Sequence, residues 1–268
     1  MLLNLLLRTW RHHWTTLLIW TGFCLLEGIY NLALYPYFNS LPEYSSYLAA
    51  LPPWVLFIES LPAHLTGDAA FLFLTTFGFT APCAWLVLAI RVGLKETAGE
   101  EESGSIIFLL PHPIQRWNLY LAKALAISIL IVVMGVLFWA SMNAVATLAK
   151  INVSIDWLAW STLNLGLFVL WCSAVAMLLG SFFSRVDLPA LLVGLIILVM
   201  WAVQGLTHLN SISPGVSWFN PWSLVIMTMV EKNLITPWVW GVMTCLIILS
   251  FAGGMASWQL KNFYSLTE

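Results

Sequence analysis

The stretch WLAWSTLNLGLFVLWCSAVAMLLGSFFS, which runs from Trp157 to Ser184, contains no Asp, Glu, Lys or Arg. A helix needs about 20 apolar residues to cross the hydrocarbon core of a bilayer, which is roughly 30 Å thick. This stretch is therefore long enough for one membrane span. Because so long a run lacks the alternation of a short barrel strand, we expect the span to be a helix.

The same pattern recurs along the chain. Further charge-free stretches lie at 69–90, 124–149, 188–230 and 233–260, and an apolar stretch at 14–36 is broken only by Glu27. The pattern predicts an all-α membrane protein, with residues 1–268 forming a single transmembrane domain. Its six predicted spans lie near 14–36, 69–91, 118–148, 157–183, 188–208 and 237–258.

Composition excludes other classes of protein. Only 8% of the residues are charged and 61% are hydrophobic, whereas about 25% of the residues of an ordinary soluble domain are charged. Such a chain cannot cover a water-soluble surface or remain disordered in water. The formal net charge is -2, so no basic field indicates a nucleic-acid partner. We expect membrane lipid to surround the protein.

The positions of Lys and Arg predict the orientation. If the N-terminus is cytoplasmic, eight of the ten Lys and Arg residues lie inside, and only Lys150 and Lys232 lie outside. Cytoplasmic loops of membrane proteins carry such an excess. We therefore expect a multi-pass protein of the cell membrane, with both termini cytoplasmic, and expect the membrane to be the bacterial inner one.

Residues 1–13 have an amphipathic pattern. Arg8, Arg11 and His12 recur at helical spacing, and Leu and Trp residues occupy the opposite side. The pattern predicts a helix that lies in the cytoplasmic interface before the first span. The alternative is that it extends the first span into water. The adjacent His12 and His13 are expected to be interfacial side chains.

One loop, residues 92–117, is dense in charge. The acidic run Glu100–Glu102 precedes Gly104, and an apolar stretch, 106–110, follows before Pro111 and Pro113. Pro113 is suited to the first turn of a new helix. The pattern predicts a short amphipathic helix that docks a partner at the cytoplasmic surface. The alternative is a solvated loop whose charges only follow the positive-inside rule.

This loop resembles the first cytoplasmic loop of permeases of ATP-binding cassette (ABC) transporters of the type-2 (ABC-2) exporter class. The resemblance rests on Glu100–Glu102, Gly104, Leu109-Leu110, Pro113-Ile-x-Arg116 and Lys123. Chain length, six spans, cytoplasmic termini and the N-terminal interfacial helix agree with that family. Ser105 stands where the family usually has Thr, and His112 stands where a small hydroxyl residue is common.

The resemblance implies that the 92–117 loop couples this chain to a separate ATPase subunit. Glu100, Glu101 and Glu102 would then dock that subunit, Gly104 would form the turn, and Arg116 would anchor the loop through an ion pair. The chain has no GxxxxGK[ST] motif, which binds phosphate in ATPases. We therefore expect it not to be an enzyme itself, with no catalytic residue and no cofactor, while ATP and Mg are bound by the partner.

The resemblance also implies a second permease copy, expected as a homodimer that encloses a central route. In the family, short re-entrant exterior helices cap the exit of this route, and the segment 210–237 occupies the same place. Pro and Gly interrupt that segment, and its residues 223–230 are apolar enough to enter the outer leaflet. An ordinary interfacial loop is the alternative.

Several polar residues fall inside predicted spans, where they cost free energy unless they find partners. Glu27 is the only charged residue of the first span. The candidates for the translocation pathway are Glu27, Asn143, Asn164, Gln204 and His208. For each of them, a structural role within the helix bundle is the alternative.

We interpret the chain as the permease subunit of an ABC exporter that moves a hydrophobic or amphipathic substrate. The alternative is a membrane scaffold or immunity protein that binds a partner without transport. Enzyme motifs such as HExxH and GxSxG are missing, and the five scattered histidines form no metal-binding pattern.

Overall fold

The computed structural model describes residues 13–40, 67–105, 116–209, 213–230 and 236–261, and this part of the chain contains helices and no strand. The helices are α2 (Trp14–Asn39), α5 (Gly67–Leu72), the π-helical turn η1 (Phe73–Phe77), α6 (Thr80–Lys95), α7 (Ala98–Glu102), α8 (Arg116–Ala149), α9 (Ile155–Phe182), α10 (Asp187–His208), the 3-10 helix η3 (Pro214–Phe219), α11 (Pro221–Val230) and α12 (Thr236–Leu260).

Among the described residues, six helical segments are long and apolar enough to cross a membrane. They are α2, the continuous segment Gly67–Lys95 made of α5, η1 and α6, and α8, α9, α10 and α12. The predicted all-α membrane protein with six spans is thereby confirmed. The second span extends one turn beyond the predicted end at residue 91, because Val92 and Leu94 are buried and continue the packed face of α6.

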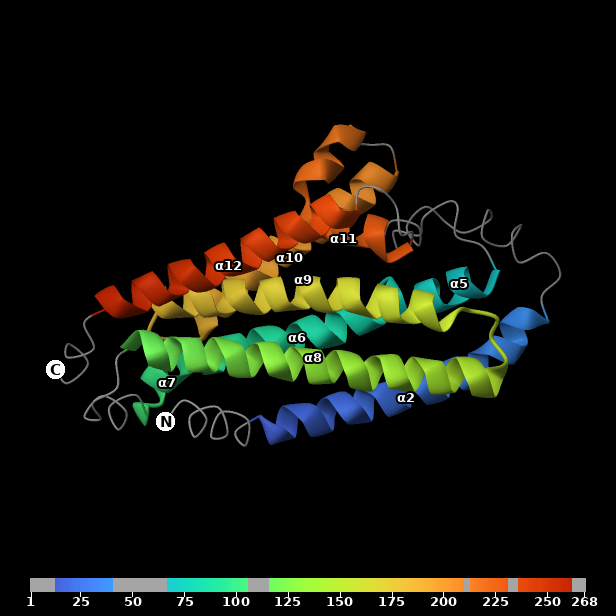
Figure 1. Cartoon of the computed structure of the whole chain (residues 1–268), viewed down its shortest axis with the longest axis horizontal. Coiled ribbons are helices and arrows are strands. Elements are labelled where there is room, and N and C mark those ends of the chain that lie inside the picture. Colours follow the sequence, from blue (N-terminus) through green and yellow to red (C-terminus); the bar gives the residue numbers. More distant parts are fainter. Residues whose placement is uncertain (1–12, 41–66, 106–115, 210–212, 231–235, 262–268) are drawn as a thin grey trace.

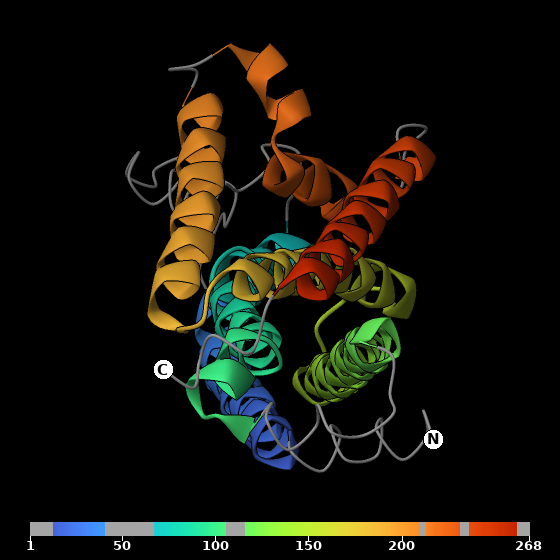
Figure 2. The ribbon, with the colours of Figure 1, turned by 90° about the vertical axis from the view of Figure 1, so that its left-hand side faces the viewer.

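The long helices run side by side along the long axis of the molecule (Figure 1). Viewed along that axis, α6 and α9 lie in the middle, with α2 and α8 on one side and α10 and α12 on the other (Figure 2). Most residues of Gly67–Lys95 and Ile155–Phe182 are accordingly buried, whereas few residues of α10 and α12 are buried. The outer helices thus leave broad apolar faces for lipid or for another chain.

Large aromatic side chains fill the centre of the bundle. Trp20 of α2, Trp85 of α6 and Phe138 of α8 are fully buried, and the centroids of the Trp20 and Trp85 rings lie 5.2 Å apart. The indole N–H of Trp20 donates to the carbonyl oxygen of Met134 at 2.8 Å. Such rings contribute much apolar surface to a core, and a buried indole N–H needs a partner.

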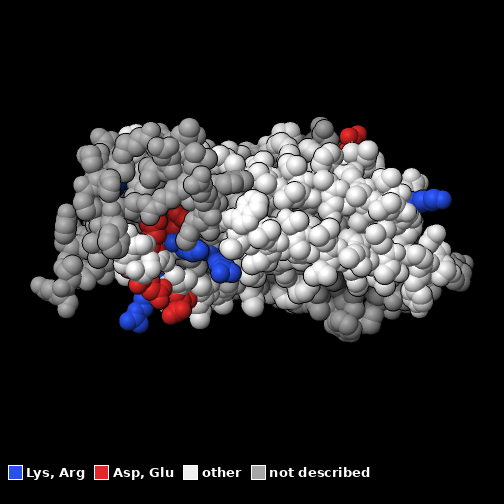
Figure 3. Space-filling view, turned by 90° about the horizontal axis from the view of Figure 1, so that it is seen from below, with Lys and Arg blue, Asp and Glu red and all other residues white. Residues whose placement is uncertain are grey.

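Charged side chains gather at the two ends of the bundle and leave an uncharged band between them (Figure 3). We call the end at which α2 begins and α12 ends the charged end; α7 lies there (Figure 1). The described Lys, Arg and Glu residues of this end are Arg91, Lys95, Glu96, Glu100, Glu101, Glu102, Arg116, Lys123, Arg185 and Lys261. The fold thus brings residues from all parts of the sequence to one site.

Other predicted segments are described only in part. The predicted interfacial helix, residues 1–13, lies outside the described residues except for His13. The apolar stretch 106–110 of the predicted docking helix also lies outside them. In the segment 210–237, the structure has the short helices η3 and α11, and the re-entrant placement of these helices stays a prediction.

Candidate functional site

The site begins with the tight turn between α6 and α7. Thr97 precedes α7, is fully buried, and donates its hydroxyl hydrogen to the carbonyl oxygen of Gly93 at 3.1 Å. Gly180 of α9 lies against it, and a Cβ atom at Gly180 would overlap the Thr97 hydroxyl. A side chain at position 180 would therefore separate the turn from α9. Glycine here lets the central helix support the turn directly.

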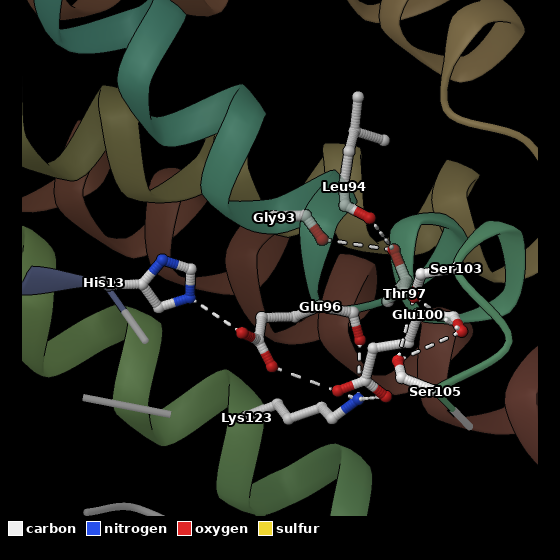
Figure 4. Close-up of polar contacts among 9 residues, drawn as sticks. All are labelled: His13, Gly93, Leu94, Glu96, Thr97, Glu100, Ser103, Ser105 and Lys123. Carbon is white, nitrogen blue, oxygen red and sulfur yellow. Dashed lines mark hydrogen bonds and ion pairs between the residues drawn. The ribbon is translucent and has the colours of Figure 1, made fainter. Parts of the chain in front are cut away.

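Glu96, at the end of α6, joins two other helices (Figure 4). Its Oε1 lies 2.7 Å from Nε2 of His13, the residue just before α2. Its backbone carbonyl accepts a hydrogen bond from Nζ of Lys123 in α8 at 2.7 Å. All three side chains are buried. A buried charge is tolerated when it is paired and hydrogen-bonded, and this network supplies such partners.

The three glutamates of α7 point to three different parts of the chain. Oε2 of Glu100 lies 2.5 Å from Nζ of Lys123 in α8. Oε1 of Glu101, a buried side chain, lies 2.7 Å from Nζ of Lys261, which follows α12. Together they hold α7 against α8 and the end of α12.

The third glutamate, Glu102, is exposed. Its Oε2 accepts a hydrogen bond of 3.0 Å from the backbone N–H of Val186, in the connection between α9 and α10. Its partner is a main-chain group and its surroundings are open to solvent. Of the three carboxylates, that of Glu102 is therefore the one most accessible to another molecule.

Lys261 connects further elements of the charged end. Its Nζ also donates to the carbonyl oxygen of Phe183 at 3.0 Å, where α9 has just ended. Its own carbonyl oxygen accepts a hydrogen bond of 2.8 Å from Nη1 of Arg116, the first residue of α8. The Nζ of Lys123 lies 5.2 Å from the ring centroid of Trp258 in α12, a cation–π distance. The start of α8 is thus tied to the end of α12.

Gly104 follows α7 with φ +68°, and no atom lies near the position of a Cβ. This left-handed conformation costs glycine little and other residues more. Ser103 and Ser105 contact each other through their hydroxyl oxygens at 3.0 Å, and both hydroxyls lie 3.3 Å from the carbonyl oxygen of Glu100. The chain therefore turns sharply where it leaves α7, as Figure 4 shows.

The short helix α7 and the turn before it contact α8, the ends of α9 and α12, and the start of α2 through polar side chains. If α7 moved, its ion pairs and hydrogen bonds would also displace α8 and the ends of α9 and α12. Glu96 would extend the displacement to the start of α2. Networks of packed and hydrogen-bonded groups carry such coupling when they have two discrete arrangements. The contacts of α7 therefore connect it to several helices of the bundle.

Residues 86–231 match the family model described as ABC-2 family transporter protein. This is more than half of the chain, and it includes α7, α8, α9 and α10. The chain belongs to the ABC-2 transporter family. It is therefore a multi-pass membrane protein and a permease component of an ABC transporter. A search of curated proteins found no match.

In this ABC-2 chain, Glu27 lies in a buried polar cluster rather than alone among apolar side chains. Its Oε1 accepts hydrogen bonds from the hydroxyls of Thr76 at 2.9 Å and Thr80 at 3.1 Å. Asn31, one turn further along α2, donates to Thr76 at 2.9 Å and accepts from Thr75 at 2.7 Å. The π-helical turn η1 carries Thr75 and Thr76, and such turns are frequent at functional sites. A pathway role of Glu27 stays a prediction.

The other pathway candidates are dispersed. Oδ1 of Asn164, a buried residue of α9, accepts hydrogen bonds from Thr228 and from Trp240, each at 2.9 Å. Gln204 of α10 accepts a hydrogen bond from Ser223 of α11. Both therefore hold α11 against neighbouring helices. Their part in a pathway is still a prediction.

Asn143 lies in α8 and donates to the carbonyl oxygen of Trp139 in the same helix at 2.8 Å. His208 is the last residue of α10, and its side chain is outside the described part. Neither residue is brought to α7. The four candidates whose side chains are described thus share no hydrogen bond with one another.

Sequence reasoning missed part of the charged end. His13, which we expect at the membrane interface, is a buried partner of Glu96 at the end of α6; its place relative to the membrane stays a prediction. Glu96 and Lys261 were not singled out at all. Their positions do indicate residues of the charged end, since Glu96 lies within the charged loop and Lys261 follows the last span. The sequence does not indicate which residue each of them contacts.

Proposed function

We propose that this chain is the transmembrane permease subunit of an ABC exporter, moving a hydrophobic or amphipathic substrate with energy from ATP hydrolysed by a separate nucleotide-binding subunit. ATP and Mg would be bound by that subunit. Family membership supports the permease role. The observation that carries the coupling role is the anchoring of α7, whose three glutamates contact three different parts of the chain.

The proposed mechanism is a shift between two states. Closure of two ATPase subunits on ATP would displace the 92–117 loop, and the α7 contacts would pass this motion to α8 and to the ends of α9 and α12. Nucleotide would bias an existing equilibrium between inward-open and outward-open arrangements. Glu102, exposed beside Gly104, is the α7 carboxylate best placed to meet the ATPase.

The charge distribution supports a cytoplasmic charged end. Six of the described Lys and Arg residues lie at that end, namely Arg91, Lys95, Arg116, Lys123, Arg185 and Lys261, and Lys150 lies at the opposite end. An excess of Lys and Arg indicates the cytoplasmic side. In this orientation both termini and α7 are cytoplasmic, where ATPase subunits are found, and the bacterial inner membrane fits.

The exposed faces of α2, α10 and α12 support a second permease copy. Leu25, Leu26, Leu195 and Leu249 are among the large apolar residues that remain exposed. Lipid would cover part of such faces, and a homodimer would bury the rest around a central route.

Purification of this chain in mild detergent, followed by mass spectrometry of the intact complex, tests the proposal. We expect two permease copies with two soluble ATPase chains. A complex with a different permease would replace the homodimer by a heterodimer. Recovery of this chain alone, under conditions that preserve ABC complexes, would refute the exporter and favour the scaffold or immunity protein.

Cross-linking tests the location of the contact. Ser103 is exposed directly after α7, and Leu148 is exposed at the opposite end of α8. The exposed Cys83 and Cys245 are first replaced by Ala, while the buried Cys24 and Cys172 are kept. We expect the Ser103→Cys variant, and not the matched Leu148→Cys variant, to cross-link to the ATPase.

A further inference from the structure

A hollow of about 440 Å³ lies at the charged end, between α6, α7 and the beginning of α10. Its walls include Val87, Ile90, Arg91 and Lys95 of α6, Gly99 of α7 and Ala190 of α10. The apolar part of the wall belongs to a small hydrophobic cluster around Leu94 and Val193, separate from the main core. Glu96 does not line the hollow.

Two cations line this hollow without a partner. Arg91 and Lys95 are four residues apart on α6, so they lie on one face of the helix. In the described part of the chain, neither side chain has a hydrogen bond or an ion pair, although Lys95 is partly buried. A pair of neighbouring cations repels unless an anion lies between them.

The described acidic residues nearby do not pair with these two cations. Glu100 and Glu101 pair with Lys123 and Lys261, and Glu102 accepts from the N–H of Val186. Asp187, at the beginning of α10, does not line the hollow. Glu102 and Asp187 keep their negative charges near the hollow, because Glu102 contacts the lining residue Val186 and Asp187 follows it. Neither forms an ion pair with Arg91 or Lys95 in the described part of the chain, so both cations are open to an anionic ligand.

The lining changes from charged to apolar with depth. Lys95 ends α6 at the charged end, whereas Val87 lies eight residues earlier, about 12 Å deeper along the helix axis. On the facing helix, α10 begins at Asp187, and Ala190 lies a turn deeper. A ligand that fills the hollow must place an anionic group near the helix end and an apolar group towards the middle of the bundle.

We infer that this hollow binds an anionic phospholipid, with its phosphate between Arg91 and Lys95 and an acyl chain along Val87, Ile90 and Ala190. Basic pockets between membrane helices on the cytoplasmic side are suited to anionic headgroups. A free phosphate ion would leave the apolar wall uncovered, and the ammonium group of a zwitterionic lipid would be repelled by the two cations. The two cations at the helix end and the apolar wall below them together favour an anionic lipid over both alternatives.

The bound lipid would contact α6, α7 and α10 together. Gly99 lines the hollow, and Val186 also lines it while it donates to Glu102. An anionic lipid would therefore stabilise one position of α7 relative to α10. This inference does not depend on an ATPase partner, so it can fail or succeed independently of the proposed export function.

Native mass spectrometry of the purified full chain tests the inference, with phosphatidylglycerol and phosphatidylcholine offered at equal concentration. We expect preferential retention of phosphatidylglycerol. Each cation near a membrane surface contributes roughly a five-fold gain in affinity for anionic lipid. The Arg91→Gln and Lys95→Gln variants should therefore each lose roughly five-fold, and the double variant roughly 25-fold. The matched control, Lys150→Gln at the opposite end, should retain the preference.

A second variant separates the hollow from the charges. Ala190→Trp keeps both cations and fills the space between the helices, so phosphatidylglycerol retention should fall while phosphatidylcholine retention stays low. If the double variant fails to fold, the Ala190→Trp variant still tests whether the lipid occupies the hollow.

Equal retention of the two lipids by the unchanged chain, or undiminished retention by the double and Ala190→Trp variants, would overturn the inference. Displacement of phosphatidylglycerol by inorganic phosphate alone would also overturn it, in favour of a soluble-anion site.

Discussion

The Nζ of Lys261 lies 2.7 Å from Oε1 of Glu101, although Glu101 belongs to α7 and Lys261 follows the last span. The Glu101 side chain is fully buried, whereas 17% of the Lys261 side chain is exposed. The pair thus joins the α7 turn to the end of α12. Its unequal burial means that the two partners will not be equally sensitive to substitution.

Loss of Lys261 should cost more stability than loss of Glu101. Lys261→Met leaves a buried carboxylate without its partner, which costs about 3 kcal/mol. Glu101→Gln leaves an ammonium group that still reaches solvent and the Phe183 carbonyl, so its cost should be smaller. Thermal unfolding in detergent measures both changes, and the double variant should be more stable than Lys261→Met alone. A double-variant loss equal to the sum of the two single losses would show that the pair is not coupled, and equal single losses would contradict the argument from unequal burial.

Gly180→Ala should separate the α6–α7 turn from α9. The added Cβ would overlap the Thr97 hydroxyl, and overpacking of this kind costs about 1–3 kcal/mol. Thr97→Ala in the same chain should recover most of the loss, because the overlapping oxygen is then gone. Gly194→Ala is the matched control, since no atom lies near its Cβ position. The unfolding temperature should fall only for Gly180→Ala, and a fall for both glycines would contradict the proposed contact.

Glu102→Gln should affect assembly more than stability. Glu102 is exposed and accepts one backbone hydrogen bond, so the substitution should cost less than about 1 kcal/mol. If Glu102 docks the ATPase, the amount of ATPase that copurifies should fall while the membrane level of this chain stays normal. Unchanged copurification would remove Glu102 from the docking surface. Reversal of all three glutamates to Lys is a poorer test, because it would place Lys beside Lys123 and Lys261.

Glu27→Leu should destabilise the bundle by about 1–3 kcal/mol, because the buried hydroxyl of Thr76 would lose its carboxylate acceptor. The hydroxyl of Thr80 would keep the carbonyl oxygens of Thr75 and Thr76 as acceptors. Glu27→Gln keeps an acceptor oxygen and should be nearly as stable as the unchanged chain. Transport per folded complex then distinguishes the two roles of Glu27. Normal transport by Glu27→Gln indicates a structural role, and a strong loss in a stable Glu27→Gln protein indicates a role in the pathway.

The helices could be predicted from the sequence because a span is specified locally. A run of about 20 apolar residues must satisfy its backbone polar groups within itself when it enters lipid. The positions of α8 and α9 therefore followed from the absence of charge in 124–149 and 157–184. The turn at Gly104 was likewise predictable, since glycine next to an acidic run is a local signal for a break.

Only the tertiary structure decided which side chains meet. The sequence showed Glu27 as a polar residue in an apolar span, but the helix that supplies its hydroxyl donors depends on how α2 packs against η1 and α6. It showed an acidic run in one loop, but not that Glu100 and Glu101 each pair with a lysine from a different part of the chain. Helix formation in a membrane depends on neighbouring residues of one segment, whereas the pairing of buried charges depends on the order in which the helices are arranged. The first is therefore readable from the chain, and the second is a property of the packed bundle.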